Sequence, residues 1–178
     1  MIDNNTSGSL AGRWALVTGA GRRIGAAIVA GLHEAGANVV VHYFKSGEAA
    51  EALVANLNSA RSESALAIQA DLTDSAALPL LLADVTATTG RLDVLVNNAS
   101  SFYPTPLGSI TEEQWDDLLG SNLKAPLFLC QAALPHLKES QGVIINIVDV
   151  HSQRPLKNHP VYGATKAGLA MLTRSLAK

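Results

Sequence analysis

The strongest constraint on the fold is a short apolar segment that runs through glycines into a helical pattern. Residues 14–17 are apolar and suit a buried strand, and the turn that follows contains Gly19 and Gly21. Over residues 24–35 the apolar side chains recur with helical spacing, and Gly36 ends the pattern. A strand that passes through a tight turn into a helix is the first half of a strand–helix–strand unit. The chain therefore begins as an α/β protein.

Extended and helical segments go on alternating along the chain. Further strands are predicted at residues 38–44, 65–70, 92–96 and 143–148. Helices are predicted at residues 48–57 and 75–89, the second with Pro79 in its early turns. Such alternation predicts a doubly wound, Rossmann-like parallel sheet with helices on both faces.

Capping and proline signals locate two further helices. Thr111 and Gln114 have the spacing of a capping box and open a long helix, which Pro126 and Pro135 are expected to kink or end. Pro160 opens the last helix in the favoured first-turn position. We expect a flexible segment at residues 1–12 and one domain at residues 13–178.

The composition argues against several classes of function. Lysine and arginine number 13 against 15 acidic residues, so the net charge of −2 offers no basic surface to nucleic acid. No apolar run is long enough to cross a membrane, and residues 1–12 lack the features of a signal peptide. Cys130 is the single cysteine and is expected to be a buried filler, which fits a cytoplasmic protein. No metal is predicted, because His42, His136, His151 and His159 lack metal-ligand spacing.

The turn after the first strand carries the signature of a phosphate site. Its glycines let the backbone bend tightly and approach a pyrophosphate that lies on the N-terminus of the next helix. A plain strand–helix turn is the alternative, and the strand and helix on either side favour the nucleotide site. The predicted cofactor-binding residues here are Gly19, Arg22, Arg23 and Ile24.

The end of the second predicted strand indicates which nicotinamide cofactor is bound. NAD-binding proteins usually place an acidic residue there to hold the ribose hydroxyls. Residues 42–46 contain no carboxylate, and Lys45 and Ser46 instead join the two arginines of the turn in offering partners to a 2′-phosphate. Solvated surface charges are the alternative, but the missing acid favours NADP(H).

Tyr162 and Lys166 are four residues apart and share one face of the last predicted helix. A neighbouring ammonium favours the phenolate, so we expect Lys166 to lower the pKa of Tyr162 towards a range useful in acid–base catalysis. Taken alone, this spacing is a weak signal.

Several motifs together resemble the short-chain dehydrogenase/reductase family. They are Thr18-Gly19 with Gly25, Asn97-Asn98-Ala99-Ser100, Asn122, and Tyr162 with Lys166, in the family's order. The resemblance implies that Tyr162 donates a proton, that Lys166 lowers its pKa and binds ribose, and that Asn122 supports a proton-relay water. It also implies that Asn98 and Ala99 line the cofactor, and that Asp71 and Leu72 meet the adenine.

Two residues depart from the common family pattern. Arg23 stands where most members have glycine, and Asp149 stands where most have serine, thirteen residues before the tyrosine. A serine hydroxyl can donate a hydrogen bond to a ketone oxygen, which an ionised carboxylate would repel. A substrate with N–H groups, or a ring nitrogen that takes a proton, would suit an acidic residue instead.

Both departures occur in the pteridine reductases, which the run of residues 97–107 and the strand end at residues 42–46 also resemble. The resemblance implies that Phe102 stacks on a pterin against the nicotinamide, and that Ser100 and Arg23 bind pterin and cofactor phosphates. It also implies that Asp149 and Tyr162 deliver protons to ring nitrogens. The expected function is NADPH-dependent reduction of biopterin-like or folate-like rings.

Two alternatives stay open, a carbonyl reductase of the same family and a non-catalytic relative that only binds nucleotide. Family members continue for at least two more strands beyond the position of Lys178, so the chain looks C-terminally truncated. The helix opened by Thr111 and the helix opened by Pro160 resemble the pair that forms the family's dimer seam. We therefore expect a homo-oligomer, a tetramer by resemblance.

Overall fold

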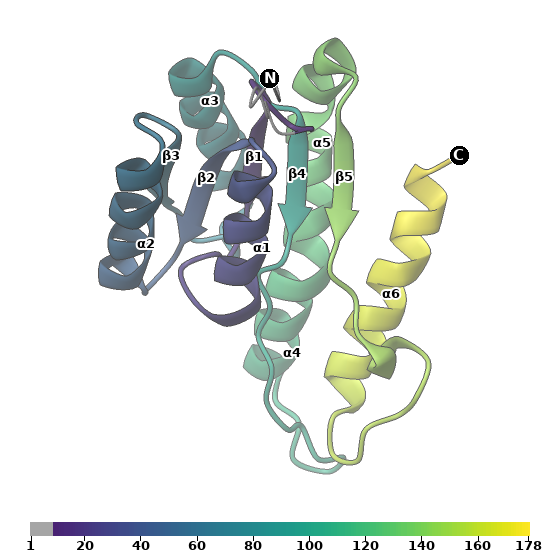
Figure 1. The fold of residues 1–178 in the computed structure, drawn as a ribbon. Helices are drawn as coiled ribbons and strands as arrows, with labels where there is room; N and C mark the ends of the chain where they lie inside the picture. The colour runs from purple at the N-terminus through teal and green to yellow at the C-terminus, as the bar shows by residue number, and fades with distance from the viewer. Residues whose placement is uncertain (1–8) are drawn as a thin grey trace.

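The structure, a computed structural model, describes residues 9–178 and contains one parallel sheet of five strands (Figure 1). The strands are β1 (Trp14–Val17), β2 (Asn38–Tyr43), β3 (Ala65–Gln69), β4 (Val94–Asn97) and β5 (Val143–Asn146). Their order across the sheet is β3-β2-β1-β4-β5, and every neighbouring pair is parallel. The predicted doubly wound α/β fold is confirmed. Because the order reverses between β1 and β4, a ligand crevice is expected at the carboxyl ends of these two strands.

Helices cover both faces of the sheet. The helices are α1 (Arg23–Glu34), α2 (Gly47–Ala60), α3 (Ala77–Thr89), α4 (Glu112–Leu119), α5 (Ala125–Ser140) and α6 (Pro160–Leu176). In β1, Ala15 and Val17 pack in the cluster formed with α1 and α2, whereas Leu16 packs in the cluster formed with α3 and α5. Helix α6 lies beside β5, at the right in Figure 1. The alternation of side chains along each strand therefore divides the core into two layers.

The long helix predicted from the capping box does not end at its prolines. The capping box of Thr111 and Gln114 is present, and α4 passes through a π-helical turn, η1 (Gly120–Lys124), into α5. Pro126 lies in the first turn of α5, next to the wide π-helical turn that leads into it, and Pro135 lies inside α5. A proline there removes one backbone hydrogen bond, and the buried neighbours Ala133 and Leu137 hold the helix against the sheet. The prolines were predicted to kink or end the helix, and the helix ends at neither of them.

Side-chain turns delay the start of α3 relative to the prediction. Asp71 Oδ1 accepts from the backbone N–H and the hydroxyl of Thr73, and Asp74 Oδ1 accepts from the N–H of Ala76. Short polar side chains that bond the following backbone compete with helix formation, so α3 begins at Ala77 rather than at residue 75. β5 also ends two residues early, because the chain turns into the short helix η2 (Val150–Ser152).

Most of the predicted flexible segment, residues 1–8, lies outside the described residues. Within the described part, the N–H of Leu10 donates to the carbonyl of Ala35 at 3.0 Å, which fixes the turn before β1 to the end of α1. Across residues 9–178, none of the helices is both long enough and apolar enough to traverse a lipid bilayer.

Candidate active site

A cavity of about 950 Å³ opens at the carboxyl ends of β1, β2 and β4. All the predicted site residues except Asn122 and Lys166 line it. They are Gly19, Arg22, Arg23, Ile24, Lys45, Ser46, Asp71, Leu72, Asn98, Ala99, Ser100, Phe102, Asp149 and Tyr162. Residues from six separate stretches of the chain therefore meet at the place where parallel α/β sheets bind their ligands.

The turn between β1 and α1 has the geometry of a phosphate cradle. Gly19 has a positive φ of 60°, and a Cβ atom there would lie 2.9 Å from the Cα of Ala99. At Gly25 a Cβ atom would lie 2.5 Å from the carbonyl oxygen of Gly19. The first turn of α1 has no side-chain cap, so its backbone N–H groups are left to an anion.

Arg23 adopts a left-handed conformation, with φ of 52°. A residue with a Cβ atom is destabilised there by roughly 1–2 kcal/mol, which explains why glycine is the common choice at such a position. Arg22, Arg23 and Lys45 together place three cationic side chains around one end of the cavity. This charge fits a phosphate-bearing ligand.

Asp149 and Tyr162 are joined directly by a hydrogen bond. The phenol of Tyr162 donates to Asp149 Oδ2 at 2.7 Å, and Asp149 Oδ1 accepts from the backbone N–H of His151 at 2.9 Å. The His151 N–H is the main cause that lowers the pKa of Asp149, with Tyr162 also contributing, although partial burial opposes them. The carboxylate is therefore ionised at neutral pH, and it accepts hydrogen bonds from both neighbours.

The expectation that Lys166 would lower the pKa of Tyr162 was wrong in this geometry. Burial of the phenol raises the pKa of Tyr162, and the carboxylate of Asp149 raises it further. Lys166 Nζ donates to the carbonyl of Ile147 at 3.1 Å and lies 5.7 Å from the centre of the tyrosine ring, and burial lowers the pKa of Lys166. The close carboxylate outweighs the more distant ammonium, so the phenol keeps its proton.

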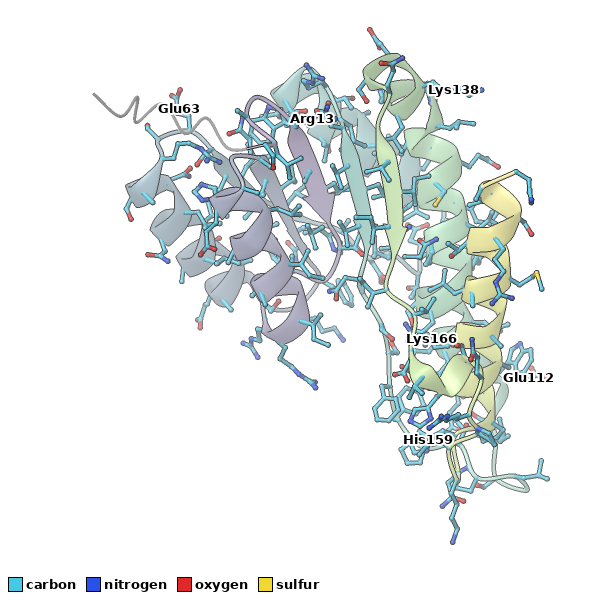
Figure 2. All side chains as sticks on the ribbon, turned by 45° about the vertical axis from the view of Figure 1, so that its right-hand side comes forward. Arg13, Glu63, Glu112, Lys138, His159 and Lys166 are labelled. Carbon is cyan, nitrogen blue, oxygen red and sulfur yellow. The ribbon has the colours of Figure 1, made fainter. Side chains whose placement is uncertain are left out.

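Phe102 lies over this pair and is 56% exposed. Its ring stacks on His159 at 4.8 Å between centroids, with 14° between the planes, and meets Tyr162 edge-on at 4.8 Å. Figure 2 labels His159 and Lys166 at the lower end of the molecule, the end at which the strands terminate. An exposed aromatic ring beside an acid–base pair offers a flat surface to a planar ligand.

The segment that carries Phe102 is held by hydrogen bonds to residues that are distant in sequence. The amide of Asn122, on η1, bonds both the N–H and the carbonyl of Ser101 at 2.9 Å. The hydroxyl of Tyr103 donates to Asp117 Oδ2 at 2.8 Å, and the N–H of Thr105 donates to the carbonyl of Asn158. Asn122 is fully buried and clamps the backbone, so its amide does not face the cavity. Its predicted support of a relay water stays a prediction.

Several residues that line the cavity were missed by reasoning from the sequence. They are His42, Phe44, Thr73, Ser101, Asp117, Ser121 and His151; Gly25 also lines the cavity and belongs to the glycine motif identified in the sequence. His42, Thr73 and His151 follow or end strands, and this position is a usable signal. Asp117 and Ser121 come from α4 and η1, and nothing in their local sequence marks them. Among residues 9–178, no three His, Cys, Asp or Glu side chains are grouped to hold a metal ion.

Comparison with known proteins relates the whole described domain to one family. The family model for short chain dehydrogenases matches residues 13–178. Pteridine reductase 1 of Leishmania tarentolae is 37% identical over 201 residues, covering 92% of this chain and 70% of that protein. The 3-oxoacyl-[acyl-carrier-protein] reductase FabG of Staphylococcus aureus is 40% identical over 165 residues, covering 92% of this chain and 67% of that protein.

Versicolorin reductase 1 of Aspergillus parasiticus is 36% identical over 177 residues, covering 99% of this chain and 66% of that protein. The chain thus spans about two thirds of the length of each of these relatives. Their names give three different substrates at similar identity, so the choice among substrates must rest on the residues of the cavity.

Proposed function

This chain belongs to the short-chain dehydrogenase/reductase family, whose members are NAD(P)-dependent oxidoreductases, and we propose that it is an NADPH-dependent pteridine reductase. The substrate is a biopterin-like or folate-like ring, and the reaction adds a hydride and a proton across a ring C=N bond. The hydrogen bond between Asp149 and Tyr162 is the observation that carries this proposal.

The cationic end of the cavity favours NADPH over NADH. Lys45, Arg22 and Arg23 line the cavity beside Ser46, and the end of β2 carries no carboxylate to hold the 2′-hydroxyl of NADH. The glycine turn and the uncapped N-terminus of α1 fit the pyrophosphate. The bound cofactor supplies the hydride, and the protein orients it.

Asp149 favours a nitrogen heterocycle as the substrate. An ionised carboxylate at this position repels a ketone oxygen and the negative charge that develops on it, but it accepts hydrogen bonds from ring N–H and amino groups. A pterin carries several such donors. Phe102 offers one face of the ring a stacking partner, which orients the C=N bond.

Tyr162 is the proton donor of the reaction. Its raised pKa keeps the phenol protonated, so the proton is present when the ring nitrogen gains electrons. As the proton leaves, the phenolate is stabilised by the ammonium of Lys166, which lies over the ring. Solvent then returns a proton to the phenolate, so that one hydride and one proton are consumed in each turnover.

The decisive experiment compares substrates in the variant Asp149→Ser. Oxidation of NADPH is followed at the nicotinamide absorbance with dihydrobiopterin and, separately, with a simple 3-keto ester. We expect the wild type to reduce dihydrobiopterin, and we expect Asp149→Ser to lower kcat/KM for dihydrobiopterin by roughly 100-fold while leaving the rate with the ketone equal or higher. Asp84→Ser, an exposed aspartate on α3, serves as the matched control. Unchanged pterin reduction in Asp149→Ser would remove the basis of the proposal.

A carbonyl reductase is the second candidate, favoured by the identity to FabG. Reduction of the keto ester by the wild type, with no reaction of pterins or folates, would select it. Binding of NADPH without turnover of either substrate would select the non-catalytic relative. The same assay therefore separates all three possibilities.

We also propose that copies of the chain associate through α4, α5 and α6. Trp115, Phe128 and Leu134 on α4 and α5, and Met171 on α6, expose large apolar side chains. Light scattering should give the mass of a tetramer, and Phe128→Asp should shift the mass towards the monomer. A wild-type monomer would contradict this arrangement.

A further inference from the structure

A buried histidine lies under the phosphate turn and takes no part in the acid–base chemistry. His42 is the fifth residue of β2, is 1% exposed, and adjoins the floor of the cavity. It lies three residues before Lys45 in the sequence, but unlike Lys45 its side chain is buried. A polar ring buried to this extent needs hydrogen-bond partners.

The two ring nitrogens of His42 bond different parts of the nucleotide site. The N–H of Gly19 donates to the ring Nδ1 at 3.1 Å, and the N–H of Ala20 donates to the His42 carbonyl at 2.8 Å. On the other side of the ring, Nε2 lies 3.1 Å from the carbonyl oxygen of Ala70, the residue just before Asp71. One side chain thus links the turn after β1 to the chain that leaves β3.

These partners allow only one protonation state of the ring. A backbone N–H can only donate, so Nδ1 must be the acceptor, and a carbonyl can only accept, so Nε2 must carry the proton. The neutral Nε2–H tautomer satisfies both bonds, whereas the doubly protonated ring would set two donors against each other at Gly19. Burial accordingly lowers the pKa of His42 to about 4.

The bond to His42 holds the first glycine of the turn in place. Gly19 has a positive φ, and its carbonyl accepts from Asn98 Nδ2 at 3.1 Å. With its N–H on His42 and its carbonyl on Asn98, Gly19 is held through both of its backbone polar groups. The next N–H, that of Ala20, is also bonded to His42, so the start of the turn is fixed to the end of β2.

We propose that His42 is a positioning residue for NADP(H): its Nδ1 holds the phosphate turn at Gly19, and the bond from Nε2 to Ala70 fixes the tautomer that makes Nδ1 an acceptor. It acts through Gly19 and does not touch the cofactor itself. The inference rests on the cofactor binding that the family implies, and it is independent of which substrate is reduced.

Two substitutions can remove the two bonds one at a time. The amide oxygen of asparagine can occupy the place of Nδ1, and the amide nitrogen of glutamine can occupy the place of Nε2. His42→Asn therefore keeps the acceptor for Gly19 and loses the bond to Ala70. His42→Gln keeps the bond to Ala70 and loses the acceptor for Gly19, and His42→Leu loses both.

The dissociation constants of NADPH and of 2′,5′-ADP are measured by calorimetry for each variant, with His136→Asn, outside this cavity, as the matched control. We expect His42→Leu and His42→Gln to bind NADPH at least about tenfold more weakly than the wild type, and His42→Asn to stay within about threefold. Urea unfolding of each variant without cofactor separates loss of binding from loss of folding. If His42→Leu does not fold, the comparison of asparagine with glutamine decides.

Equal weakening in all three variants, or wild-type affinity in His42→Gln, would overturn the proposal. A second readout does not depend on binding. The ¹⁵N shifts of the His42 ring should show the Nε2–H tautomer with and without NADPH, and a ring protonated on Nδ1 would contradict the assigned role.

Discussion

Mild acid should destabilise the fold through His42. In the folded chain burial lowers its pKa from 6.5 to about 4, so the unfolded chain takes up a proton first as the pH falls. The stabilisation from keeping this ring neutral is complete above pH 6.5 and is lost as the pH falls towards about 4. The perturbation is therefore a change of pH from 7 to 5, without any substitution.

The shift in pKa sets the size of the effect. A fall from 6.5 to about 4 corresponds to roughly 3 kcal/mol in total, because each pKa unit is about 1.4 kcal/mol. At pH 5 the unfolded ring is almost fully protonated while the folded ring is about one-tenth protonated, so about 2 kcal/mol is already lost. This is a large fraction of the stability of a typical domain.

Urea unfolding at pH 7 and pH 5, followed by circular dichroism, measures the loss in the wild type and in His42→Asn. The pKa of His33 is also lowered by burial, so the wild type alone cannot assign the effect. The variant keeps His33 and lacks the titrating ring at residue 42, so its loss of stability should be smaller by about 2 kcal/mol. Equal losses in the two proteins would refute the reasoning.

Three further predictions follow from single contacts. Tyr103→Phe removes the hydrogen bond to Asp117 and should raise KM for dihydrobiopterin by about three- to tenfold, with NADPH affinity unchanged by calorimetry; a change in NADPH affinity alone would contradict it. Gly25→Ala places a Cβ atom 2.5 Å from the Gly19 carbonyl oxygen and should abolish NADPH binding in the same titration. Unchanged affinity would show that this turn does not bind the cofactor phosphates. Leu129→Ala removes most of a fully buried side chain and should lower the free energy of unfolding, measured in urea, by about 2–5 kcal/mol. A loss below about 1 kcal/mol would contradict this, because it would mean that the surrounding side chains close the cavity.

The sequence was sufficient for the fold because the strands and helices have clear periodicity and the turns have clear chemistry. It also placed the glycine turn and Asp149 at the ends of parallel strands, and the family resemblance added Tyr162; all three line one cavity. Spacing could place Tyr162 and Lys166 on the same helix. It could not show that Asp149 would lie within 2.7 Å of the phenol and reverse the expected pKa shift.

The role of His42 was missed for a related reason. In the sequence it continues an apolar strand, and its partners Gly19 and Ala70 lie 23 and 28 residues away. Bonds of this kind depend on the register of three strands, which local patterns do not encode. At Pro135 the local signal was clear but did not decide the structure. A proline usually interrupts a helix, and here the packing of α5 on the sheet outweighs that tendency.

The π-helical turn at Gly120–Lys124 holds one residue more than a regular helical turn would need. Loss of one residue from this turn would therefore allow a regular helix and leave α4 and α5 almost in their present phase, whereas the same loss inside α5 would rotate the residues beyond it by about 100°. Which residue is lost matters, because Asn122 lies in this turn and clamps the backbone of Ser101. A one-residue deletion here that keeps Asn122 should spare the folded state, and the same deletion in the middle of α5 should not.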